Sequence, residues 1–218
     1  MPAMVHELAA HDPEARALFS VEYTAPSWSL RQASGNDGLE DLIADVPWDA
    51  VVLQERSSYL SFSREWWGEE TLPFALDLRR DIGADGAQPV VVMSRGYEHG
   101  NGNGDSYDGM QARVADGYEE LADLLSADVA PVGLAWAAAV RARPELDLWK
   151  GDGRHPTEEG SYLAACVFRA DGPGPSRQRL LRPTHAGGRP LPSAHSRRRG
   201  RRVRSDSLDL VEPDLLGA

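Results

Sequence analysis

Residues 48–54, WDAVVLQ, carry a clear strand pattern. They contain an unbroken apolar run, Ala50-Val51-Val52-Leu53, with a polar residue on each side. Two further runs follow at 89–94 (PVVVMS) and, more weakly, at 127–132 (ADVAPV). Uninterrupted apolar runs rich in β-branched residues are typical of strands buried on both faces, as in parallel sheets. These three runs therefore predict a parallel sheet.

Helical patterns separate these runs, because apolar residues recur at the spacing of one helix face. The segments are 39–43, 71–82, 107–125, 134–140 and 157–168. We expect Thr157 to be the N-cap of the last one. Strands alternating with helices predict an α/β fold with helices on both faces of the sheet. Residues 18–24 (LFSVEYT) are a candidate for one more short strand.

Charge is distributed unevenly along the chain, whose net charge is -11. Residues 1–170 contain 13 basic and 29 acidic residues, whereas residues 171–218 contain ten arginines and five acids. An acidic body repels phosphate backbones, so we expect no nucleic-acid partner. The arginine cluster at 197–204 leaves a nucleic-acid-binding arm as the alternative for the tail.

The composition changes abruptly after Phe168. From residue 171 onward there are six prolines, six glycines and no aromatic residue. We therefore predict a domain over 1–170 and a disordered, basic Pro/Gly/Arg-rich tail over 171–218. The change falls within a helix whose apolar face is incomplete, and a reading-frame change in the gene is our hypothesis for it.

Several classes of protein are excluded by what the sequence lacks. It has no run of 18 apolar residues and no N-terminal leader pattern, so we expect a cytoplasmic protein without a membrane span. The one cysteine, Cys166, allows neither an internal disulfide nor a zinc cluster. The glycine-rich segment 96–104 lacks the pattern of a phosphate loop, so we interpret it as a surface loop, with a lid as the alternative.

The strongest chemical signal is residues 151–157, GDGRHPT. An aspartate at 152 can accept a hydrogen bond from one ring nitrogen of His155, which leaves the other nitrogen to act as a general base on a hydroxyl. Pro156 favours an extended conformation for the histidine. The spacing alone also fits a surface Asp–His loop or, less well, a two-residue metal site.

The longer string DxxHPTxxGxYLAA at 152–165 resembles the last conserved block of the SGNH (GDSL-like) hydrolases. Residues 48–57 resemble the block at the third strand of one branch of that family. Trp28-Ser29-Leu30 and residues 130–136 are similar to two further blocks. The likeness covers roughly residues 1–169, and it implies a flavodoxin-like, three-layer α/β/α fold.

The resemblance also implies a serine ester hydrolase acting on a small-molecule ester. Asp152 would orient His155, and His155 would activate a serine that attacks the ester carbonyl and forms an acyl-enzyme. Gln54 and Ser29 are the candidates for the oxyanion and substrate-binding region. Glu55 either bears on this site or is an exposed loop acid. The mechanism requires no metal and no cofactor.

The chain departs from the family at the nucleophile. The family's first strand and its Gly-Asn-Ser-like turn have no counterpart, because residues 1–5 resemble the helix that follows them. Pro26-Ser27 stand where glycines are expected. The serines near predicted strand ends lack the family's turn; they are Ser27, Ser29, Ser57 and Ser94. Ser34-Gly35-Asn36-Asp37 echoes that turn, but we interpret it as a turn with an N-cap.

Two expectations follow from the missing block. Activity is impaired without the nucleophile, and a non-catalytic ligand-binding module of the same fold is the alternative function. The first strand is central in a flavodoxin-like sheet, so its absence leaves neighbouring strands without a shared partner. We therefore expect this chain to be less stable than a complete relative.

Overall fold

The computed structural model describes residues 2–12, 18–84, 86–102 and 104–171. Three parallel strands form one sheet in the order β1-β2-β3. They are β1 (Ala50–Leu53), β2 (Gln88–Val92) and β3 (Asp128–Ala130). Val52 is paired with Val90, and Val90 with Asp128. The predicted strands are thus confirmed at the three apolar runs, and the predicted tail, apart from its first residue Asp171, lies outside the described residues.

The helices alternate with the strands, as the sequence predicts. They are α1 (Pro2–Ala10), α2 (Leu30–Ala33), α3 (Asp37–Asp45), the 3₁₀ helix η1 (Tyr59–Ser61), α4 (Arg64–Glu70), α5 (Leu72–Ala84), α6 (Tyr107–Leu125), α7 (Val132–Ala142) and α8 (Glu158–Asp171). The five predicted helices correspond to α3, α5, α6, α7 and α8. In the described part of the chain, no helix is long and apolar enough to cross a membrane.

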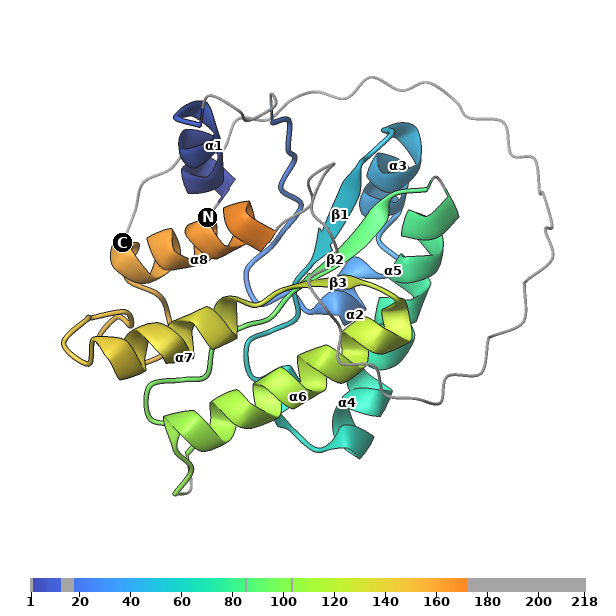
Figure 1. Ribbon diagram of the computed structural model, residues 1–218. Coiled ribbons are helices and arrows are strands. Elements are labelled where there is room, and N and C mark those ends of the chain that lie inside the picture. The colour runs from blue at the N-terminus through green and yellow to red at the C-terminus, as the bar shows by residue number, and fades with distance from the viewer. Residues whose placement is uncertain (1, 13–17, 85, 103, 172–218) are drawn as a thin grey trace, which may run out of the picture. The chain divides into compact units, whose positions relative to one another are not determined.

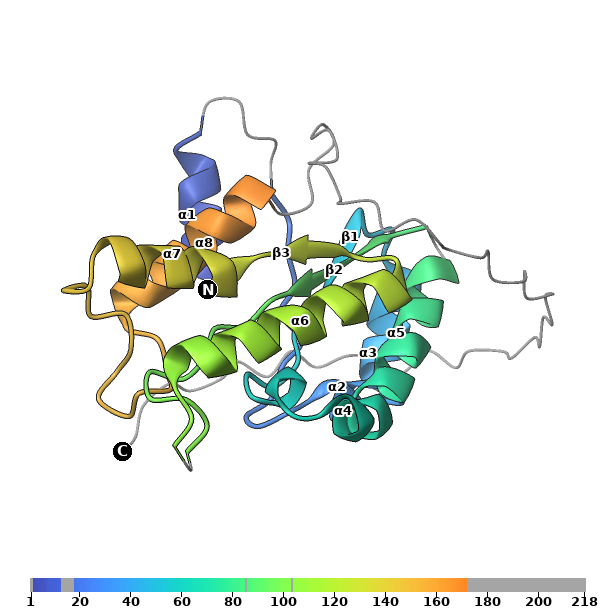
Figure 2. The same ribbon diagram turned by 60° about the horizontal axis from the view of Figure 1, so that its bottom comes forward.

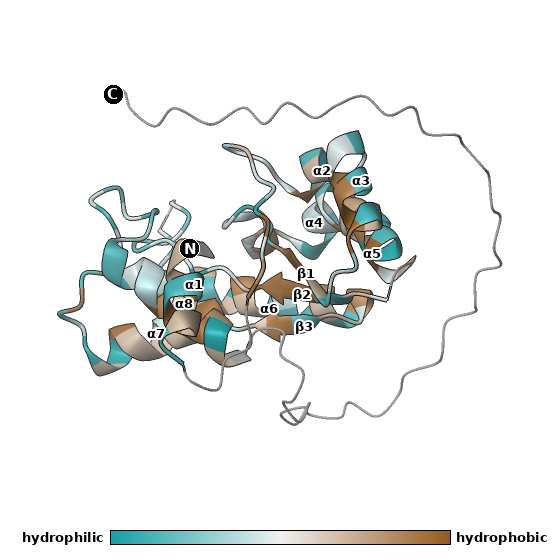
Figure 3. Ribbon diagram, turned by 90° about the horizontal axis from the view of Figure 1, so that it is seen from above, coloured by the Kyte–Doolittle hydropathy of each residue, from teal (hydrophilic) through white to brown (hydrophobic). Residues whose placement is uncertain are grey.

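The sheet lies between two layers of helices (Figures 1 and 2). Leu53, Val91 and Met93 face a core built mainly with α3, α5 and α6. Val90, Val92 and Ala130 face a second core built with α7, α8 and the segment that joins them. Alternate residues of β2 therefore enter opposite cores, and this is why its sequence is apolar throughout. In Figure 3 the strands are among the most hydrophobic segments.

Two predicted caps are present. The Thr157 hydroxyl accepts a hydrogen bond from the Gly160 N–H at 3.1 Å, so Thr157 caps α8. Asn36 caps α3, since its side-chain oxygen accepts from the Leu39 N–H at 3.1 Å. Gly35 has a φ of +73°, which glycine adopts readily. The Ser34–Asp37 string is thus a turn and N-cap, as predicted.

The prediction of a strand at residues 18–24 is wrong. The segment forms no strand and exposes Leu18, Phe19, Val21 and Tyr23. Phe19 contacts the residues just before β1, because its ring stacks on that of Trp48 with centroids 5.8 Å apart. Alternating apolar residues make a strand only when a partner strand accepts their backbone hydrogen bonds, and no described strand pairs with this segment.

Candidate functional site

The loop that precedes α8 holds Asp152 against His155. Asp152 Oδ2 lies 2.5 Å from His155 Nδ1, and Oδ1 accepts the backbone N–H groups of Arg154 and His155 at 2.8 and 2.9 Å. The hydrogen bond from His155, followed by the two backbone bonds, holds the pKa of Asp152 well below its usual range. A carboxylate only accepts hydrogen bonds, so Nδ1 carries the hydrogen and Nε2 is the basic nitrogen.

The backbone of this loop is fixed by short-range hydrogen bonds. Lys150 N donates to His155 O, and Gly153 N donates to Lys150 O, both at 2.8 Å. The glycine-rich segment joins it, because Glu98 N donates to Gly153 O at 2.8 Å. Gly153 has a φ of +65°, a conformation that favours glycine. The described residues of the predicted surface loop at 96–104 are therefore confirmed as a loop, which contacts the segment between Asp152 and His155.

The reactive nitrogen of His155 faces outward. The side chain is 72% exposed, and Nε2 forms no hydrogen bond with any described residue. None of the four candidate serines, Ser57 included, forms a hydrogen bond with it: Ser94 is buried and its hydroxyl lies 3.3 Å from the Tyr118 hydroxyl. Ser27 lies in a turn with a left-handed φ of +63°. Within the described chain, His155 is thus paired with Asp152 and with no serine.

Gln54 and Ser29 lie in different environments. Gln54 directly follows β1 and is exposed. Ser29 is buried and caps α2, because its hydroxyl donates to Gln32 Oε1 at 2.6 Å and accepts from Arg31 N at 3.3 Å. The Ser29 hydroxyl is therefore engaged in starting the helix. The oxyanion and substrate-binding roles of both residues stay predictions.

A buried carboxylate that the sequence left ambiguous connects these segments. Glu55 is only 2% exposed, so it is not a surface loop acid. Its Oε1 accepts the N–H groups of Leu30 and Arg56 at 3.3 and 2.7 Å, and its Oε2 accepts the Thr71 hydroxyl at 3.0 Å. Burial nevertheless raises the pKa of Glu55 above its ordinary value, against these hydrogen bonds. The only sequence signal was its position just after a strand.

The same network reaches the end of β2. The Tyr118 hydroxyl, from α6, donates to Glu55 O at 3.4 Å and also contacts Ser94. The next residue, Arg95, donates from Nη2 to Arg154 O at 2.6 Å, in the loop of the Asp152–His155 pair. The ends of β1 and β2 and the loop before α8 thus meet at one edge of the sheet. Sequence reasoning missed Arg95, although the end of its strand was an expected location.

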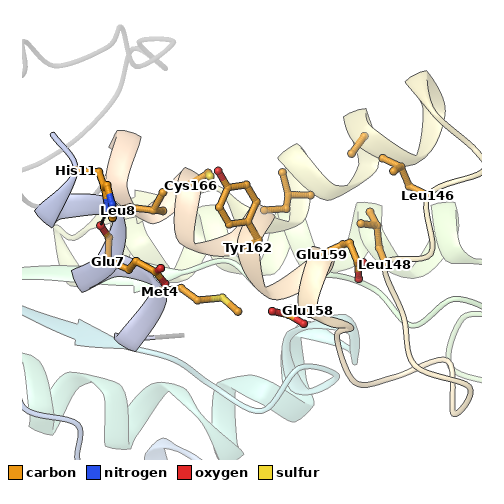
Figure 4. A pocket seen from close by; sticks show the side chains of 12 residues that line it. Met4, Glu7, Leu8, His11, Leu146, Leu148, Glu158, Glu159, Tyr162 and Cys166 are labelled. Atoms are coloured by element: carbon orange, nitrogen blue, oxygen red, sulfur yellow. Dashed lines mark hydrogen bonds between the residues drawn. The ribbon is translucent and has the colours of Figure 1, made fainter.

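A separate hollow of about 810 Å³ lies along α1 and α8 (Figure 4). Met4 and Leu8 of α1 and Tyr162 and Cys166 of α8 are among its lining residues. Neither Asp152 nor His155 lines it. No cluster of His, Cys, Asp and Glu side chains suited to a metal ion occurs among the described residues. The hydrogen-bonded pair at the sheet edge, and not this hollow, is therefore the candidate active site.

Comparison with known proteins bears on the fold of the chain. No protein-family model and no curated protein matches the sequence. A solved structure described as "a putative SGNH hydrolase from Slackia heliotrinireducens" is similar over 66% of this chain and 79% of its own, with 27% identity and a TM-score of 0.56. A DUF4886 family protein from Bacteroides uniformis is similar over 66% of this chain and 60% of its own, with 21% identity and a TM-score of 0.50. The protein described here therefore has an SGNH-hydrolase-like fold, as the resemblance of its sequence predicts.

Proposed function

We propose that this protein is a serine ester hydrolase of the SGNH type, acting on an acyl ester or an O-acetyl group, and that its activity is impaired because no described serine is hydrogen-bonded to His155. The observation that carries the proposal is the 2.5 Å contact between Asp152 and His155, at the edge of the sheet where active sites of α/β folds lie. The side chain of His155 is open to an incoming substrate. The SGNH-hydrolase-like fold supports the same class of reaction.

In this reaction His155, Asp152 and Gln54 have different roles. His155 Nε2 takes the proton of a serine hydroxyl while the serine oxygen bonds to the ester carbonyl carbon. Asp152 stabilises the imidazolium through Nδ1–H, and the histidine then gives its proton to the leaving alcohol as the ester C–O bond breaks. Water repeats the sequence on the acyl-enzyme and releases the acid. The Gln54 side-chain amide, just beyond β1, is our candidate for donating to the carbonyl oxygen.

A non-catalytic ligand-binding module is the second candidate. One observation favours it: within the described residues, no serine is hydrogen-bonded to His155. A module of this kind keeps the Asp152–His155 pair but forms no acyl-enzyme.

Labelling with a fluorophosphonate, which phosphonylates activated serines, separates the two candidates. Because we expect impaired activity, we expect one serine of the protein to be labelled slowly, and peptide mass mapping then assigns the nucleophile. His155→Ala should abolish the labelling, whereas His6→Ala, which removes a histidine of α1 bonded to Ser20, should not. Labelling that survives in His155→Ala, or its absence in the wild-type protein, would exclude the hydrolase and favour the binding module.

A further inference from the structure

Arg95 differs from most described arginines in its electrostatic surroundings. Six described arginines form ion pairs with carboxylates: Arg31, Arg64, Arg80, Arg113, Arg143 and Arg169. Arg95 is half-buried and forms no ion pair with any described carboxylate. A partly buried cation without a counter-charge is costly, because the protein replaces water without replacing its stabilisation. In an acidic body, such a residue requires a functional explanation.

The inner side of the Arg95 guanidinium offers no compensating acceptor. Its Nε is buried and has no hydrogen-bond partner in the described chain. The guanidinium carbon lies 5.5 Å from the ring centroid of Trp136, a side chain that is itself buried. An aromatic face attracts a cation, but it does not neutralise the charge. The positive charge of Arg95 is therefore not neutralised from the inner side, and a ligand can contact it from the outer side.

The outer side of Arg95 opens onto the candidate active site. Nη2 donates to Arg154 O at an exposed position, one residue before His155. Asp152 is near enough to stabilise the cation, but its oxygens are already engaged by His155 and by two backbone N–H groups. Glu98, on the adjoining loop, faces His99, with 3.8 Å between Glu98 Oε2 and His99 Nε2. Thus no described carboxylate forms an ion pair with Arg95.

A second cation adjoins Arg95. Arg154 is exposed and also forms no ion pair with a described carboxylate. Its guanidinium carbon lies 5.2 Å from the centroid of the Tyr97 ring, on the neighbouring loop. Two arginines thus flank the histidine, while residues 1–170 carry an excess of 16 negative charges. These two positive charges offset Asp152 and Glu98 on the same loops, and they give an anionic ligand two cationic contacts within an otherwise acidic body.

We propose that Arg95, assisted by Arg154, binds a carboxylate of the substrate, so that the enzyme prefers esters that carry a free carboxylate near the scissile bond. This inference rests on the proposed function and adds its substrate class. A guanidinium matches a carboxylate through parallel N–H donors. A singly charged carboxylate also meets less repulsion from the acidic body than a doubly charged phosphate does.

The test compares two esters that differ only in this charge. One is 4-nitrophenyl succinate with its free carboxylate, and the other is the same ester with that carboxylate methylated. We expect the wild-type protein to prefer the charged ester. Arg95→Gln should lower kcat/KM for the charged ester about tenfold or more, the range for a charge-assisted hydrogen bond, and change the neutral ester less than twofold. Arg95→Lys should recover part of the preference, and Arg80→Gln, on α5, should keep all of it.

Two further measurements separate failure of this inference from failure of the proposed function. Hydrolysis that depends on His155 but falls equally for both esters in Arg95→Gln would overturn the carboxylate site and leave the hydrolase intact. If no ester is hydrolysed, binding of monomethyl succinate and of dimethyl succinate is compared by the NMR shifts of the His155 ring. Tighter binding of the charged compound, lost in Arg95→Gln, supports the site; equal binding overturns it. Circular dichroism of each variant shows whether it is folded.

Discussion

The loop before α8 and the outer edge of β1 lie in the same described fold, yet they differ in whether their hydrogen-bonding groups have partners within the described chain. In the loop, Asp152 accepts hydrogen bonds from the His155 ring and from two backbone N–H groups, and all of these partners lie within three residues of it. At the outer edge of β1, no described strand is paired with it. Phe19, in the segment that precedes β1, is 72% exposed. Contacts between near neighbours in sequence form on their own, whereas a parallel strand needs a partner from far away. The comparison separates local from non-local determinants of this fold.

The largest expected effect comes from breaking the local contact itself. Asp152→Asn should slow fluorophosphonate labelling about 10³-fold to 10⁴-fold, because an amide no longer stabilises the imidazolium. The Asn side-chain oxygen still accepts the N–H groups of Arg154 and His155, so thermal stability should change little. Labelling rates and melting curves measured together test both statements.

Asp77→Asn is the matched control for this substitution. Asp77 and Arg80 form an exposed pair with the same spacing of three residues, 2.8 Å apart on α5. Removing that charge should leave the labelling rate unchanged. Equal rates for Asp152→Asn and the wild-type protein would mean that the aspartate has no part in the reaction.

The next effect tests how the loop depends on the packing of α8. A Cβ atom at Gly160 would lie 2.5 Å from Leu148 O and closer still to the Trp136 ring. Gly160→Ala should therefore lower the free energy of unfolding by about 1–3 kcal/mol, the usual cost of overpacking. Gly151→Ala is the control, because a Cβ there would meet no atom within 4 Å. Chemical denaturation measures both variants, and equal stability of the two would contradict the predicted close packing around Gly160.

The features that the sequence predicted correctly depend on local contacts, and those that it did not predict depend on distant ones. Residues 50–53, the stripe of 107–125 and the Asp–His loop were predicted because periodicity, capping and spacing are local properties. The segment 18–24 has the alternation of a strand, but whether it pairs depends on a partner that its own residues do not encode. Glu55 and Arg95 were missed or left ambiguous for a related reason. Their burial and their contacts come from α6, α2 and the loop before α8, which are distant in the chain.

Glu55, which directly follows β1, makes stability depend on pH. Because burial raises its pKa in the fold, the protonated form is favoured by the folded state. Its contribution to stability is full below the ordinary value near 4.5 and is lost as pH rises through the folded pKa. Glu55→Gln removes this titration while keeping an acceptor for Leu30 and Arg56. Unfolding measured from pH 4 to pH 7 should show the wild-type protein losing stability relative to Glu55→Gln; a parallel pH dependence would contradict it.

The smallest expected change in stability tests the open edge. Val52 is 40% exposed on β1, so Val52→Lys should alter the free energy of unfolding by no more than about 0.5 kcal/mol. A lysine on an exposed edge opposes pairing with another chain, so sedimentation should show less self-association than in the wild-type protein. Leu124→Lys makes the same exchange at a 42% exposed site of α6 and should leave association unchanged. A loss of about 2 kcal/mol or more in Val52→Lys alone would mean that this edge is covered in solution, and the contrast between the hydrogen-bonded loop and the open edge of the described sheet would then no longer hold.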